Sequence, residues 1–371
     1  MSKFIIGLVL FSGYFMFAFS WVLGDIYIGS MGYSATEVGE STSTLNIVKM
    51  LANLVGGVLI GKVLAEKVFK FNVYGFMLGM ITIAAGLIVA SMTEAFALLL
   101  ISRALVGLGG GMILFTLSPI TASVFEGKAL SLVNGTNSSA YSGGIAVASA
   151  LGVMIATHTI DVIHVTVGIL VLLAVVLFLA KLNVQPLVPE GSNGEEQKPA
   201  SLKQAVMTPF NWIFMLTFTA AIVFFTLMFT FASKMNIEAT PFLWAAVGGN
   251  VVGIILGGSF PHKKVATISS IIAAIAGVAF FMGGIPSAAL VCGFALFAGI
   301  PSYITLAFNQ SWATPASLGT TFMMLWIGSD SIVAATSISF PSLIGSPASN
   351  LVLVALLAMY ATGTAVIAKK Y

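Results

Sequence analysis

Residues 95–117 read AFALLLISRALVGLGGGMILFTL, an almost unbroken apolar run with one arginine near its start. A helix needs roughly 20 mostly apolar residues to cross the hydrocarbon core of a bilayer. The run lacks the alternation of apolar and polar residues that is typical of a strand in a membrane barrel. Residues 95–117 therefore predict a transmembrane helix that carries a charge.

The whole chain has the composition of a membrane protein. Of its 371 residues, 58% are hydrophobic and 7% are charged, whereas a typical soluble domain carries about 25% charged residues. Polar residues are too few to cover the surface of a soluble globule. The formal net charge of +3 is small and scattered along the chain, so no nucleic-acid partner is expected.

Further apolar runs of similar length predict an all-α integral membrane protein with twelve transmembrane helices in two bundles of six. The predicted spans lie near 4–24, 43–63, 72–91, 95–117, 132–156 and 160–181, then 211–233, 242–260, 265–283, 286–308, 317–339 and 348–368. The one long polar segment, 182–210, is rich in proline, glycine and charge, which is typical of a solvated linker. The predicted organisation is therefore a first bundle over 1–181, a cytoplasmic linker over 182–210 and a second bundle over 211–371.

The basic residues predict that both termini face the cytoplasm, because cytoplasmic loops carry an excess of lysine and arginine. In that orientation Lys234 alone lies on the outer side, and Lys49 and Arg103 lie inside spans. The inner side receives Lys3, Lys62, Lys67, Lys70, Lys128, Lys181, Lys198, Lys203, Lys263, Lys264, Lys369 and Lys370. We therefore expect a multi-pass protein of the cytoplasmic (inner) membrane.

A short internal repeat supports two equivalent bundles. Residues 53–61 (NLVGGVLIG) align with residues 250–258 (NVVGIILGG) at an offset of 197, with five of nine positions identical. Each segment lies in the second span of its own predicted bundle. Such repeats are a mark of transporters that are built from duplicated halves.

Two local motifs resemble those of the major facilitator superfamily of secondary transporters. Residues 103–109 (RALVGLG) look like the arginine and glycine motif of its fourth helix. The junction Gly57-Val-Leu-Ile-Gly61-Lys62, followed by Glu66-Lys67, is similar to its cytoplasmic loop motif, although Gly61 stands where an aspartate is usual. The resemblance implies two rocking bundles, alternating access, and a substrate site near the membrane midplane between helices 1, 2, 4 and 5 and helices 7, 8, 10 and 11. We expect a transporter and not an enzyme.

Two cations inside the predicted spans are the first candidates for that site, because ionisable groups in a membrane usually face the bundle interior. Arg103 has the planar fork of donors that clamps a carboxylate or phosphate, or that holds a neighbouring acid ionised. It could equally be a strut bonded to carbonyl groups of adjacent helices. Lys49 belongs to a polar stripe with Asn46 and Asn53 on one helix face, although a lysine near a helix end can also reach the headgroups.

Two acids complete the candidate set for substrate binding or coupling. Asp25 is expected at the end of the first helix, where it pairs with Arg103 or Lys49 or is simply solvated. Asp330 lies well inside the eleventh predicted span. With two cations and one clearly interior acid, the excess of positive charge favours a small organic anion as substrate, coupled to protons.

Polar and aromatic side chains on the same predicted helices form a second tier of cavity candidates. For each of them, hydrogen bonding between helices is an equally good interpretation. The residues are Tyr14, Trp21, Asn46, Asn53, Asn134, Asn137, Tyr141, Asn250 and Asn309.

Other function classes fit the sequence less well. The aromatic helices could line an exporter of lipophilic cations or drugs, which is the main alternative. Seventeen methionines would suit a copper carrier, but methionine is also an ordinary filler of apolar cores. The histidines His158, His164 and His262 form no pair at metal-ligand spacing and no buried catalytic base. We therefore expect no metal and no cofactor, and a monomer whose partners are a small-molecule substrate, protons and the lipid bilayer.

Overall fold

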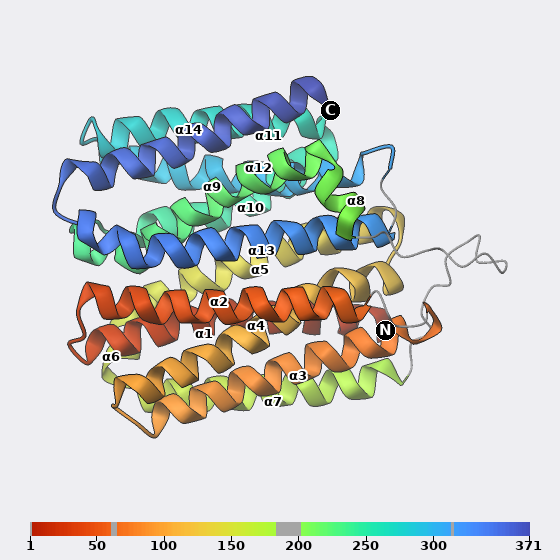
Figure 1. Cartoon of the computed structure of the whole chain (residues 1–371), viewed down its shortest axis with the longest axis horizontal. Coiled ribbons are helices and arrows are strands. Elements are labelled where there is room, and N and C mark those ends of the chain that lie inside the picture. Colours follow the sequence, from red (N-terminus) through yellow and green to blue (C-terminus); the bar gives the residue numbers. More distant parts are fainter. Residues whose placement is uncertain (1, 61–64, 183–201, 313–314) are drawn as a thin grey trace.

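The computed structural model describes residues 2–60, 65–182, 202–312 and 315–371. These residues form long helices that run side by side along one direction, and the two ends of the chain lie at the same end of the bundle (Figure 1). We call this end the termini end. No strand occurs in the described ranges, and the predicted all-α fold is confirmed.

The long helices correspond one to one with the predicted spans. Those of the first half are α1 Ser2–Ser30, α2 Ala35–Ile60, α3 Ala65–Ser91, α4 Phe96–Val124, α5 Gly127–Ala150 and α7 Thr159–Lys181, with the short α6 Gly152–Thr157 before α7. Those of the second half are α9 Pro209–Phe231, α10 Thr240–Ser259, α11 His262–Phe281, α12 Ala288–Phe308, α13 Pro315–Ser339 and α14 Pro347–Lys370, with the short elements α8 Leu202–Met207, η1 Ser233–Met235 and η2 Phe340–Leu343.

Eleven helices of the described chain are long and apolar enough to cross a membrane. The long helix that falls short is α5, whose sequence is rich in glycine, serine and asparagine. A membrane helix with this composition must bury its polar face against other helices. The polarity of α5 therefore already indicates that it lines the interior of the bundle.

Several predicted boundaries were wrong, and α1 and α2 show the largest errors at facing helix ends. Helix α1 continues past the expected end at 24 to Ser30, and α2 begins at Ala35, not at 43. The span expected over 132–156 breaks at Leu151, between α5 and α6. The extra length of α1 and α2 has one cause. An apolar run ends at the first polar residues, but the helix continues through those residues when a neighbouring helix offers their side chains a partner.

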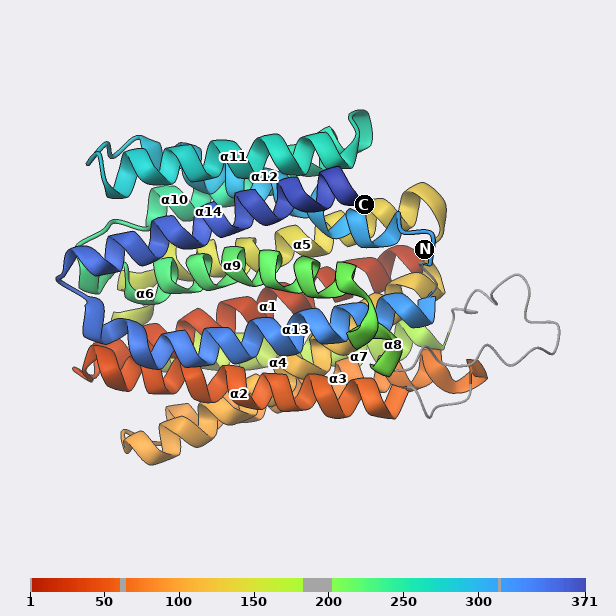
Figure 2. The same cartoon turned by 45° about the horizontal axis from the view of Figure 1, so that its top comes forward.

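The two halves pack side by side and are built in the same way. Figures 1 and 2 show the first half, coloured red to yellow-green, on one side and the second half, green to blue, on the other. In the first half α4 packs against α2 and α3, and in the second half α12 packs against α10 and α11. The halves meet mainly where α2 lies beside α13 and where α5 lies beside α10.

Glycines allow the closest of these approaches. A Cβ atom at Gly107 of α4 would collide with the carbonyl oxygen of Leu45 on α2, and one at Gly253 of α10 with that of Ala298 on α12. Small residues at helix crossings bring two backbones into van der Waals contact, which is a main source of association energy between helices in lipid.

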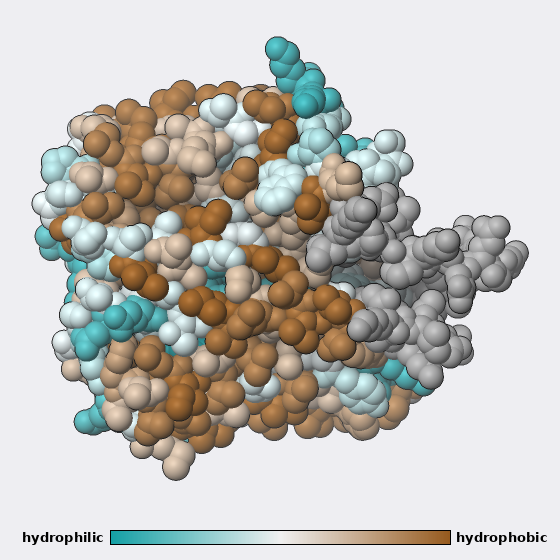
Figure 3. All heavy atoms as spheres, viewed as in Figure 1, coloured by the Kyte–Doolittle hydropathy of each residue, from teal (hydrophilic) through white to brown (hydrophobic). Residues whose placement is uncertain are grey.

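The outside of the bundle is largely apolar along its flank. Figure 3 shows hydrophobic residues over most of the visible side of the helices, with hydrophilic residues gathered toward the two ends. Large side chains such as Leu172 and Leu179 of α7 are more than half exposed. A surface of this kind suits contact with acyl chains and would be unstable in water.

Candidate functional site

An ion pair joins the two halves in the middle of the bundle. Lys49 lies about midway along α2, and its Nζ atom is 3.0 Å from Oδ1 of Asp330 on α13. The Nδ2 atom of Asn53, one turn further along α2, donates to Oδ2 of the same carboxylate over 3.3 Å. Lys49 and Asp330 are only 3% and 1% exposed. A charge pair this deeply buried is stable only as a pair, since each partner alone would be an uncompensated charge.

A second ion pair lies within the first half. Nη2 of Arg103 on α4 donates to Oδ1 of Asp25 on α1 over 2.6 Å, and its Nη1 atom donates to the carbonyl oxygen of Trp21 over 2.8 Å. The hydroxyl of Thr42 on α2 also donates to Asp25, over 3.2 Å. A Cβ atom at Gly24 would collide with Nη1 of Arg103, so the glycine makes room for the guanidinium group.

These pairs correct three expectations. Asp25 lies inside α1 and not at its end, and it is buried instead of solvated. Lys49 is far from the end of α2, so it does not reach toward the headgroups. Since Asp25 and Asp330 are both interior acids, the site holds two cations and two anions, and the expected excess of positive charge was wrong.

An aromatic cluster adjoins both ion pairs through Trp21. The ring of Trp21 lies 4.3 Å beneath Nζ of Lys49, a distance at which a cation and an aromatic face attract each other. The same ring contacts Tyr141 of α5 at 6.3 Å and Phe229 of α9 at 5.5 Å between centroids. Tyr14 of α1 stacks on Tyr141 at 5.6 Å. The cluster therefore connects α1, α5 and α9 across the centre of the molecule.

The predicted asparagines divide into a buried set and two others. Asn46, Asn53, Asn137 and Asn250 are each at most 4% exposed. Nδ2 of Asn250 on α10 donates to Oγ of Ser142 on α5 over 2.6 Å, which is a second polar link between the halves. Asn309 lies instead just past the end of α12, where it is exposed. The side chain of Asn134 on α5 lies outside the described residues.

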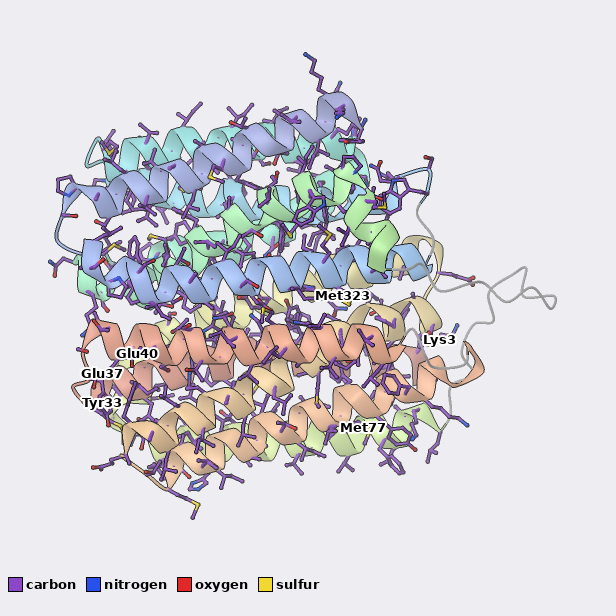
Figure 4. The ribbon with its side chains drawn as sticks, viewed as in Figure 1. Lys3, Tyr33, Glu37, Glu40, Met77 and Met323 are labelled. Carbon is purple, nitrogen blue, oxygen red and sulfur yellow. The ribbon has the colours of Figure 1, made fainter. Side chains whose placement is uncertain are left out.

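Close packing seals the site on both sides along α2 and α13. Toward the end opposite the termini, a Cβ atom at Gly39 would collide with the carbonyl oxygen of Ser337. Toward the termini end, one at Gly57 would collide with the sulfur of Met323, which Figure 4 shows beside α2. On the other side, Gly135 of α5 packs against Ile254 of α10. The four charged residues of the centre are thus almost entirely buried, with Asp25 the most exposed at 8%, and we call this arrangement the closed state.

Several residues of the site escaped sequence reasoning. Phe225 and Phe229 were not among the predicted candidates, yet they carry the aromatic cluster into the second half. Ser142 was not singled out, although it is the partner of Asn250. A phenylalanine or serine in a membrane helix is too common for the sequence to mark it. The only available signal was position, because Ser142 follows the candidate Tyr141 directly.

Among the described residues, no group of three or more histidine, cysteine, aspartate or glutamate side chains could hold a metal ion. The chemistry of the centre is that of two ion pairs, amides and aromatic rings. Such a centre can bind a solute, and it can exchange a proton at a carboxylate.

Comparisons with known proteins agree with this architecture. The family model described as Major Facilitator Superfamily matches residues 4–335. The structure of a Major Facilitator Superfamily transporter, FucP, in the outward conformation has a TM-score of 0.72 at 14% identity and covers 99% of both chains. A single-substitution variant of the E. coli fucose:proton symporter FucP has a TM-score of 0.68 at 15% identity, also with 99% coverage of both chains. No curated protein matches the sequence. At these identities the likeness to FucP shows the fold alone.

Proposed function

The chain belongs to the Major Facilitator Superfamily, and from this premise we propose that it carries a small organic anion together with a proton. As a member of that family it is a multi-pass secondary transporter of a small molecule and not an enzyme. The observation that carries the finer proposal is the buried ion pair between Lys49 and Asp330, whose partners belong to different halves.

The proton and the anion act on the same pair. Protonation of Asp330 removes the negative charge that faces Lys49, and it leaves a buried ammonium group without a counter-ion. Such a group is costly in an apolar interior. The carboxylate of a substrate restores the balance by taking the place of Asp330. Proton binding therefore favours anion binding, and by linkage anion binding favours proton binding by the same factor.

Transport requires the pair to separate, because α2 and α13 must move apart when the site opens to either side of the membrane. In the closed state Lys49 and Asp330 attract each other directly over 3.0 Å. A proton on Asp330 and an anion on Lys49 leave each half neutral on its own. The protein with both ligands bound can then change conformation without separating opposite charges in a medium of low dielectric constant.

The pair between Arg103 and Asp25 has a different role in this proposal. Both residues lie in the first half, so their bond survives a movement of one half against the other. Arg103 also bonds the backbone of Trp21, the residue whose ring supports Lys49. This pair therefore positions the ring on which Lys49 rests, and it does not contact the substrate.

A binding experiment with matched variants tests the proposal. The thermal stability of the purified protein is measured against panels of anions, cations and neutral solutes, because a ligand of the folded state raises its melting temperature. We expect protection by organic anions and loss of that protection in Lys49→Met. In Asp330→Asn the anion no longer competes with a carboxylate, so its affinity rises roughly tenfold or more, and accumulation in vesicles no longer follows a proton gradient.

The double variant Lys49→Met, Asp330→Leu is the matched control, since it removes both charges and keeps the interior apolar. It should fold and bind no anion. Protection of the native protein by lipophilic cations alone, lost in Asp330→Asn and kept in Lys49→Met, would contradict the anion proposal. That result would favour the exporter of lipophilic cations, for which the rings of Trp21 and Phe229 offer binding faces.

We also propose that the termini end faces the cytoplasm. The support is the sequence distribution of lysines, which fall mostly on that side. In a Cys292→Ala background, Glu40→Cys places a thiol at the opposite end and Lys263→Cys places one at the termini end; both positions are exposed. A membrane-impermeant maleimide applied to intact cells should label the former and spare the latter. Labelling of Lys263→Cys alone would reverse the orientation.

A further inference from the structure

From the buried amide groups around the aromatic cluster, we infer that the anion is a polyhydroxylated acid, with its carboxylate on Lys49 and its hydroxyl groups on asparagines of both halves. This inference rests on the proposed function, because it uses Lys49 as the anchor of the carboxylate. It adds a class of substrate that the ion pairs alone do not specify.

The first observation is a set of buried amide atoms without a partner. Within the described part of the chain, neither Oδ1 nor Nδ2 of Asn137 has a hydrogen-bond partner, although the residue is only 4% exposed. Oδ1 of Asn250, of Asn46 and of Asn53 is unpaired among those residues as well. An unpaired buried polar group is energetically costly, so a cluster of them indicates groups that a ligand satisfies.

The second observation is that these groups adjoin one continuous centre. Asn137 lies one turn before Tyr141 on the same face of α5, and the ring of Tyr141 is 6.3 Å from that of Trp21. Nζ of Lys49 lies over Trp21, and Asn250 reaches Ser142 next to Tyr141. An elongated ligand with its carboxylate on Lys49 would pass over the Trp21 ring and end near Asn137 and Asn250.

The balance of donors and acceptors selects hydroxyl groups. The unpaired amide atoms comprise four acceptor oxygens and one donor, Nδ2 of Asn137, and the indole Nε1 of Trp21 is a second unpaired donor at the centre, so acceptors outnumber donors. The ligand must therefore be rich in donors, and a hydroxyl group both donates to an amide oxygen and accepts from an amide nitrogen. The C–H faces of a hydroxylated carbon chain suit the rings of Trp21 and Tyr141. A simple alkyl carboxylate would leave all of these amide atoms unpaired.

The test compares ligands of equal chain length. Gluconate carries a carboxylate and hydroxyl groups, hexanoate the carboxylate alone, sorbitol the hydroxyl groups alone, and 6-aminohexanoate an ammonium group as its donor. Dissociation constants come from calorimetry on the purified full-length protein. We expect gluconate to bind roughly tenfold or more tightly than hexanoate, the ratio for about one satisfied hydrogen bond. Sorbitol and 6-aminohexanoate should bind more weakly than gluconate.

Two variants assign the effect to the site. Asn137→Ala should bring the affinity for gluconate close to that for hexanoate, with hexanoate unchanged, whereas Lys49→Met should weaken both. Asn350→Ala is the control, because Asn350 bonds the carbonyl oxygen of Phe281 away from the centre. This variant should keep the native preference. A native-like melting temperature of Asn137→Ala shows that the comparison is made on folded protein.

Each contrary result has a distinct meaning. Equal binding of gluconate and hexanoate, both dependent on Lys49, overturns the hydroxylated substrate and leaves the proposed anion transport intact. Binding of sorbitol as tight as that of gluconate, unaffected by Lys49→Met, overturns the anion itself. Tighter binding of 6-aminohexanoate than of gluconate assigns the amide oxygens to an ammonium group and overturns the inference. Protection by lipophilic cations alone removes both proposals.

Discussion

The two places where the halves meet are built on one plan and differ in charge. At the contact of α2 with α13, Asn53 bonds Asp330. At the contact of α5 with α10, Asn250, its counterpart in the sequence repeat, bonds Ser142. The position of Lys49 in α2 corresponds to that of Ala246 in α10 at the repeat offset of 197. One contact thus carries an ion pair where the other carries alanine and serine.

Next to each asparagine bond, a glycine on one helix packs against a large side chain on the other. The glycine lies on the asparagine's own helix at one contact and on the facing helix at the other. Four residues after each asparagine, Gly57 of α2 faces Met323, whereas Ile254 of α10 faces Gly135. Met323 precedes Asp330 by seven residues, and Gly135 precedes Ser142 by the same number. Because the spacings of four and of seven residues are the same at both contacts, the two contacts are structurally equivalent. Of these two contacts, the α2–α13 contact carries the ion pair, and the α5–α10 contact is its neutral counterpart.

The largest expected effect comes from breaking the charged contact. Lys49→Met leaves Asp330 buried without its partner and should lower the free energy of unfolding by about 3 to 5 kcal/mol. Replacing both residues, in Lys49→Met with Asp330→Leu, should recover most of that loss, because an apolar pair needs no counter-charge. Unfolding of the purified protein in detergent measures both values. Equal stability of the single and the double variant would mean that an unpartnered Asp330 carries no penalty, which would contradict this prediction.

The neutral contact has no ion pair to break, so a substitution at the position that corresponds to Lys49 serves as the control. Ala246→Met adds an apolar side chain where the first half has Lys49. It should leave the proton dependence of transport unchanged, even if its added volume lowers stability. A change in proton dependence in Ala246→Met would show that coupling does not reside at the α2–α13 contact alone.

A smaller effect is expected from changing the sizes of the packed residues. Gly57→Val pushes a side chain into Met323 and should cost about 1 to 3 kcal/mol through overpacking. Adding Met323→Ala should relieve the collision and restore stability, and Gly135→Val with Ile254→Ala should behave alike on the other side. Thermal unfolding measures Gly57→Val, Gly135→Val and the two double variants. Rescue at one contact and not at the other would break the equivalence inferred from the shared spacings.

The sequence predicted the fold well because bilayer-spanning helices are signalled by composition alone. The long apolar runs and the repeat at Asn53 and Asn250 required no tertiary information, whereas most of the predicted linker over 182–210 lies outside the described residues. The helix ends near Asp25 and Glu37 were missed, because their polarity is offset by partners on other helices or by local capping. Glu37, for example, accepts a hydrogen bond from the backbone nitrogen of Ser34. No pattern along a single helix reports such partners.

The candidate site was predicted as a set of residues but not as a set of pairs. Arg103, Lys49, Asp25 and Asp330 are all buried in the centre, yet nothing in the sequence indicated that Asp330 would reach across to α2. Pairing depends on how the halves meet, and Asp330 is 281 residues from Lys49. The miscounted charge balance followed directly, since it depended on whether Asp25 lay inside the helix.

The smallest expected effect on stability comes from removing the hydrogen bonds of Asn53 and Asn250. Asn53→Ala and Asn250→Ala each remove one buried hydrogen bond, so each should lower the free energy of unfolding by about 1 kcal/mol. Their effects on transport should differ, because Asn53 bonds the carboxylate of Asp330 and Asn250 bonds a neutral hydroxyl. The amide of Asn53 donates to the ionised carboxylate and stabilises it. Loss of this bond therefore favours the protonated form of Asp330. Transport in Asn53→Ala should therefore stay active to higher pH, while the pH profile of Asn250→Ala should match that of the native protein. Uptake by vesicles at a series of pH values measures the difference, and superimposable profiles for the two variants would show that Asn53 does not act through the carboxylate.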